Sequence, residues 1–94
     1  MVTYKEAIQS IIEREMEVIG KKLAIKTADE IEGLTINNSG EVKRMDRDGK
    51  EIIDDLVGKY EDRTGTVALS IIARTLSDMS GDQLDLPKRL ENRM

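Results

Sequence analysis

Apolar positions recur at intervals of three and four residues over the first third of the chain, a pattern typical of an amphipathic helix. Thr3 and Glu6 have the spacing of an N-terminal capping box, and Gly33 is placed to cap the other end. We therefore predict one long helix over residues 3–32. The apolar positions that define its first half are Tyr4, Ile8, Ile11, Ile12, Met16, Val18 and Ile19.

The apolar side of this predicted helix changes at Gly20. Before Gly20 the apolar face contains Glu15 near its middle, and beyond it Lys22 and Lys26 occupy that same face. The small and apolar residues of the second half line up on nearly the opposite side; they are Ala24, Ala28 and Ile31. The helix therefore bends or breaks at Gly20, or stays straight and contacts two different neighbours. We favour the continuous helix, because no other turn-forming residue lies near Gly20.

The pattern then changes to a period of two. Residues 34–36 and 41–43 flank the turn-forming cluster Asn-Asn-Ser-Gly at 37–40, which predicts a short antiparallel β-hairpin. An isolated hairpin is marginal in water. This one must therefore pack on helices or pair with another copy.

Two further helices are predicted after the hairpin. Asp48 and Glu51 form a second capping-box spacing, ahead of an amphipathic helix that ends near Asp62. Residues 66–78 are apolar nearly all round, so we expect this helix to be the most buried. Its only polar stripe consists of Ser70, Arg74 and Ser77.

The predicted fold is therefore a mostly α (α+β) single domain over residues 1–94. It has a long N-terminal helix, a short antiparallel β-hairpin, two further helices and a short C-terminal helix around Pro87.

The amino-acid composition excludes several kinds of catalytic and metal site. The 94 residues contain neither Cys nor His, which excludes disulfides, zinc, haem and iron–sulfur sites, and Cys–His or Ser–His nucleophiles. The glycines are dispersed and form no phosphate-binding loop before a helix. We predict a protein that is not an enzyme, with no catalytic residues, no metal and no cofactor.

Charge and hydropathy indicate which classes of partner are disfavoured and in which compartment we expect the protein. The chain has 15 Lys and Arg against 19 Asp and Glu, a net charge of -4, and no segment has a basic excess. This balance disfavours nucleic acid as a partner. No stretch approaches the roughly 20 apolar residues of a membrane span, and the N-terminus does not resemble a signal peptide. We predict a cytoplasmic protein with no membrane partner.

Three charged residues are candidates for interaction. Glu15 lies within an apolar face, where a carboxylate must be neutralised, paired or hydrated. It is either a pH-sensitive or ligand-pairing acid, or half of a structural ion pair with Arg74 or with Lys22 of a second copy. Arg74 is the only basic residue on the most apolar helix, where it either binds an anion or presents its head to solvent or to a carboxylate.

The two opposed apolar patches of the first helix, together with the apolar helix 66–78, offer more apolar surface than one small monomer needs. We therefore predict a homodimer with helix 3–32 at its interface. The function predicted from these observations is a non-catalytic protein-interaction or regulatory module with an unidentified protein partner.

Residues 41–78 resemble the ribbon-helix-helix family of dimeric DNA-binding regulators in their order of strand, helix, Gly-containing turn and helix. The resemblance implies that a strand from each of two copies pairs in the major groove. Lys43, Met45 and Arg47, on one face of that strand, would then contact bases. This alternative fails if residues 41–45 pair with residues 34–36 of their own chain.

A broader resemblance covers most of the chain. The Gly33-Leu34-Thr35-Ile36-Asn37 segment, Gly65 before an apolar helix, and the closing segment 85–90 look like small uncharacterised archaeal α-helical proteins. This resemblance implies an archaeal source and no particular activity.

Overall fold

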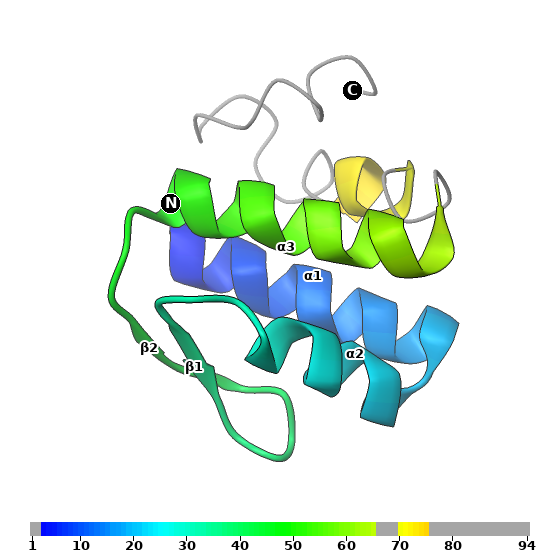
Figure 1. Ribbon diagram of the computed structural model, residues 1–94, viewed down its shortest axis with the longest axis horizontal. Helices are drawn as coiled ribbons and strands as arrows, with labels where there is room; N and C mark the ends of the chain where they lie inside the picture. The colour runs from blue at the N-terminus through cyan, green and yellow to red at the C-terminus, as the bar shows by residue number, and fades with distance from the viewer. Residues whose placement is uncertain (1–2, 66–69, 76–94) are drawn as a thin grey trace.

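The computed structural model describes residues 3–65 and 70–75 of the chain. In chain order these residues form α1 (Tyr4–Ile19), α2 (Lys21–Asp29), β1 (Leu34–Ile36), β2 (Val42–Met45) and α3 (Gly49–Thr64), and residues 70–75 are helical (Figure 1). The mostly α fold with a two-stranded antiparallel sheet is confirmed. None of the helices in these two ranges is long and apolar enough to cross a membrane.

The prediction of one continuous helix over residues 3–32 is wrong, because the helix is interrupted at Gly20. The φ and ψ angles of Gly20 are 95° and 148°, a backbone conformation that is costly for any residue with a Cβ. The chain therefore reverses at this one residue, and α2 packs back against α1 (Figure 1). The second helix also ends at Asp29, three residues short of the predicted end, so Gly33 does not cap it.

This reversal explains the change of apolar side at Gly20. Ala24 and Ala28 lie on α2 and are fully buried within their own chain. One apolar side of the predicted straight helix therefore finds its partner in the other half of the same segment. The premise of the homodimer prediction is thereby removed, and the dimer itself stays a prediction.

The hydrophobic core lies between α1, α2 and α3. Every fully buried aliphatic side chain contributes roughly 1.5–3 kcal/mol to folding relative to an exposed one. The largest buried hydrophobic side chains from α1 and α3 are Ile8, Ile11, Ile12, Ile52, Ile53, Leu56, Val57 and Tyr60. Ile72 and Ala73, from residues 70–75, complete the cluster.

The apolar character of residues 66–78 can be followed only in residues 70–75. There Ser70 and Arg74 are exposed, while Ile72 and Ala73 are buried, as the predicted polar stripe requires. Ser77 and the predicted short C-terminal helix lie outside the described residues.

The β-hairpin contains an irregularity that changes which side chains face the core. Leu34 lies opposite Met45 and Ile36 opposite Val42, which leaves Lys43 as an extra residue on β2. An extra residue of this kind interrupts the alternation of faces. Val42 and Met45 therefore both turn toward the core, although they are an odd number of positions apart, which in a regular strand would put them on opposite faces.

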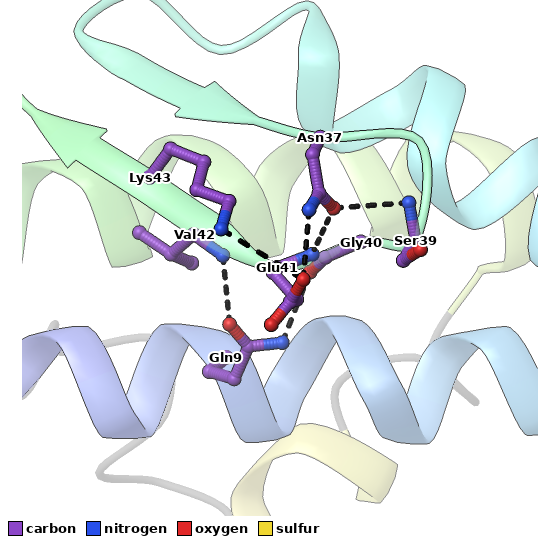
Figure 2. A network of polar contacts seen from close by, with 7 residues as sticks. All are labelled: Gln9, Asn37, Ser39, Gly40, Glu41, Val42 and Lys43. Carbon is purple, nitrogen blue, oxygen red and sulfur yellow. Dashed lines mark hydrogen bonds and ion pairs between the residues drawn. The ribbon is translucent and has the colours of Figure 1, made fainter.

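One glutamine side chain fixes the hairpin on α1. The Gln9 amide donates to the carbonyl oxygen of Gly40 at 3.0 Å, and its carbonyl oxygen accepts from the Val42 N–H at 2.7 Å (Figure 2). Within the turn, Asn37 donates to the Glu41 carboxylate at 2.8 Å. That hydrogen bond, followed by the charge of Lys43, lowers the pKa of Glu41.

The two predicted helix caps have different outcomes. Thr3 caps α1, since its hydroxyl accepts from the Glu6 N–H at 3.1 Å. Asp48 precedes α3, but its side chain makes no capping hydrogen bond, so the second capping box is wrong. The first residue of α3 has another constraint: the Tyr4 ring lies where a Cβ of Gly49 would stand.

Candidate functional site

An acidic groove lies between the end of α2, the turn that follows it, and α3. Its volume is about 430 Å³. One wall comes from Glu30, Ile31 and Glu32, and the other comes from α3 between Asp54 and Asp62. Among the described residues, its lining contains six carboxylates (Glu30, Glu32, Asp54, Asp55, Glu61 and Asp62) and one cation, Lys59.

Ion pairs at one end of the groove hold α2 to α3. Arg63 donates from one guanidinium nitrogen to both carboxylate oxygens of Glu30, at 3.1 and 3.0 Å. Lys59 lies 4.0 Å from the same carboxylate. These contacts join the last turn of α3 to the residue after α2, so they fix the separation of the two walls at that end.

Arg47 has the corresponding role at the other end. Its guanidinium donates to the Asp55 carboxylate at 2.8 Å and to the Glu32 carbonyl oxygen at 2.9 Å. Glu51 lies 3.6 Å from the same guanidinium. The hydrogen bond to Asp55 raises the pKa of Arg47, so this charge is constant across the physiological range.

The chemistry of the groove favours a cationic ligand. Ligand pockets for small organic molecules are mostly apolar, whereas carboxylates dominate here. The acidic side chains are spread along both walls, and among residues 3–65 and 70–75 no group of three or more is placed to hold a metal ion. An extended chain with several positive charges fits this distribution better than a single ion does.

Glu15, the first predicted site residue, lies in the core and not in the groove. Its side chain is fully buried, and neither carboxylate oxygen has a hydrogen-bond partner within the described residues. Burial raises the pKa of Glu15 to about 7. Burial, followed by the nearby charge of Glu15, also raises the pKa of Tyr60.

The predicted ion pair between Glu15 and Arg74 is absent. Arg74 is exposed, and no ion pair in the described part of the chain joins it to Glu15. Lys22 is also exposed, on α2. The three predicted interaction residues therefore do not form one site.

The residues predicted to contact DNA do not form one face either. Lys43 is exposed and lies 3.8 Å from Glu41, whereas Met45 packs against the core. Arg47 is held by Asp55 and Glu32 at the end of the groove. The face expected from strict alternation is lost because Lys43 is the extra residue of β2.

The strand itself is also paired within its own chain. Residues 42–45 pair with residues 34–36, which is the condition under which the ribbon-helix-helix alternative fails.

Sequence reasoning missed the groove. Its acidic residues occur as neighbouring pairs, Asp54-Asp55 and Glu61-Asp62, which read as the solvated face of a helix. The one available signal was the excess of acidic over basic residues between 49 and 63. That signal does not show that Glu30 and Glu32 face this helix, because the contact depends on the reversal at Gly20.

We compared the chain with protein families, curated proteins and solved structures, and none of them matches. The function is therefore argued from the site alone.

Proposed function

We propose that the protein is a non-catalytic interaction module that binds a basic segment of a partner protein in the acidic groove. The observation that carries this proposal is the composition of the groove: in the part of the chain that the structure describes, six carboxylates and one lysine line a space of about 430 Å³. Charge complementarity of this kind speeds association and selects the partner.

The pairing of the groove residues supports the proposal. Glu30 and Asp55 are committed to Arg63 and Arg47, which stabilise the walls. Glu32 and Asp62 are exposed, and within the described residues their carboxylates make no ion pair. These two carboxylates are therefore the ones that a lysine or arginine side chain can reach without breaking an existing contact.

The test is the binding of a fluorescently labelled, lysine- and arginine-rich peptide, measured by anisotropy at low salt. We expect saturable binding that weakens as salt is added, because exposed charges are screened. The double variant Glu32→Gln/Asp62→Asn should weaken binding by about tenfold, at roughly 0.2–1 kcal/mol for each exposed charge pair. A peptide of the same length with Gln in place of the basic residues should not bind.

The matched control is Glu13→Gln/Glu17→Gln, which removes the same charge from the exposed side of α1. It should bind the basic peptide within about twofold of the original chain if the groove is the site. Equal loss in both double variants would show that net charge alone attracts the peptide and would refute the groove. No binding to the original chain would refute the proposal altogether.

The module is also predicted to be a homodimer, and light scattering at micromolar concentration tests that separately. A mass of two chains would support the dimer predicted from the sequence. A mass of one chain would contradict the dimer and leave the groove proposal intact.

A further inference from the structure

The carboxyl group of Glu15 is the least satisfied polar group in the described part of the chain. Both of its oxygens are buried, and neither has a hydrogen-bond partner there. Buried polar groups are nearly always hydrogen-bonded, and an unpaired buried charge is costly. A group of this kind needs an explanation beyond packing, since Leu or Met would fill the same space at lower cost.

Glu15 lies on a helix that contacts three other elements of the fold. It lies on α1, and α1 packs against α2, α3 and β2. Burial, followed by the charge of Glu15, raises the pKa of Tyr60 on α3. The single hydroxyl proton of Tyr60 is already donated to the Ala24 carbonyl oxygen on α2, so it is not available to Glu15.

No described cation compensates Glu15. On α2 the charged side chains are exposed, and on β2 the two basic residues pair with neighbouring acids. On α3 the basic residues nearest in sequence to Tyr60 turn to Glu30, and Arg74 on residues 70–75 is exposed. The charged residues of these elements are Lys21, Lys22, Lys26 and Asp29 on α2, Lys43 and Arg44 on β2, Lys50, Glu51, Asp54, Asp55, Lys59, Glu61, Asp62 and Arg63 on α3, and Arg74 in residues 70–75.

We infer that Glu15 is a proton-operated latch on the junction of α1, α2 and α3. When the Glu15 carboxyl group is protonated, it stays in the core and α2 stays folded back on α1. Without the proton, the carboxylate must reach water or accept the hydrogen bond that the Tyr60 hydroxyl now donates to Ala24. The second route breaks the hydrogen bond between α3 and α2, and the first opens the packing of α1 against these helices. Either change releases α2 about the hinge at Gly20.

The short length of α2 and the glycine that precedes it indicate that α2 is the helix that separates from the core. The second helix has nine residues, fewer than an isolated helix needs in water, so its stability depends on packing. A single glycine joins it to α1, and no described atom beyond the chain neighbours lies within 4 Å of a Cβ built at that glycine.

The direction of the pH dependence follows from the burial of Glu15. Burial raises its pKa from the ordinary value of 4.5 to about 7 in the folded chain. The closed form therefore binds the proton more tightly than the open form does. The closed form is fully stabilised below about pH 4.5, loses stability as the pH rises toward 7, and changes little above that.

The test is amide hydrogen exchange of α2 between pH 5 and pH 8, corrected for the intrinsic rate at each pH. The opening equilibrium of α2 should increase by about 70-fold over this range, as expected for a pKa that is raised on closing. Glu15→Gln keeps the shape without the ionisation, so its opening should be independent of pH. Glu13→Gln, at an exposed position of the same helix, should behave like the original chain.

A second measurement keeps the inference testable if Glu15→Gln does not fold. The side-chain carboxyl carbon of Glu15 should titrate by NMR near pH 7, and the α2 amide shifts should follow the same midpoint. A midpoint near 4.5 would overturn the inference, as would pH-independent protection of α2 in the original chain. Retention of the full pH dependence in Glu15→Gln would overturn it too.

Discussion

The Tyr60 hydroxyl donates a hydrogen bond of 2.8 Å to the carbonyl oxygen of Ala24. The two residues are 36 positions apart in the chain, and both side chains are fully buried. This bond ties α2 to α3 inside the core, while the pairing of Glu30 with Arg63 ties them together at the surface. The orientation of α2, and with it one wall of the groove, depends on these two contacts.

Replacement of Tyr60 by Phe should therefore destabilise the chain by about 1–2 kcal/mol, because it removes a buried hydrogen bond without removing the ring. The free energy of unfolding in urea measures the effect. Thr64→Val is the control, since the Thr64 hydroxyl donates to the Tyr60 carbonyl oxygen one turn earlier in the same helix. We expect a loss of about 0.5 kcal/mol or less in the control. Equal stability of Tyr60→Phe and the original chain would contradict the prediction.

Replacement of Gly20 by Ala should destabilise the chain by about 1–3 kcal/mol, because a Cβ makes this backbone conformation unfavourable. No described atom beyond the chain neighbours obstructs the new methyl group, so the cost is conformational and not steric. Thermal or urea unfolding measures it. Lys21→Ala, at the exposed first residue of α2, should change stability by less than about 0.5 kcal/mol. A Gly20→Ala variant as stable as this control would show that the reversal does not require glycine.

Replacement of Gln9 by Ala should loosen the hairpin, because Gly40 and Val42 each lose a hydrogen-bond partner. A loss of about 1–3 kcal/mol is expected, together with faster amide exchange at Val42. Gln9→Glu keeps the acceptor for Val42 but sets a carboxylate oxygen against the carbonyl of Gly40, so it should not restore full stability. Unchanged exchange at Val42 in Gln9→Ala would refute this function of the glutamine.

The sequence predicted the elements better than their connections. Local spacing identified the cap at Thr3, the two strands and the amphipathic α3, because each depends on residues within a turn or two of one another. The capping box at Asp48 failed, although its spacing is the same as that at Thr3. The close contact between Tyr4 and Gly49 at the start of α3 is one that no local pattern contains.

The candidate sites show the same division. The sequence identified Glu15 as a carboxylate in an apolar face, and its burial is what that pattern implies. It also proposed Arg74 as a partner, which was wrong, since the position of a charged head group depends on how its helix packs. The acidic groove could not be predicted, because its two walls are separated by more than 20 residues of chain.

Alternation and helical periodicity in the sequence determined which residues are helical, which are extended and which side chains are apolar enough to be buried. Only the tertiary structure decided that α2 folds back on α1, that Lys43 is extra in its strand, and that Glu15 has no partner among the described residues. The physical reason is that spacing along the chain fixes the face of a helix or strand on which a side chain lies. Whether burial of that face stabilises the fold depends on the residues that a distant segment of the chain packs against it.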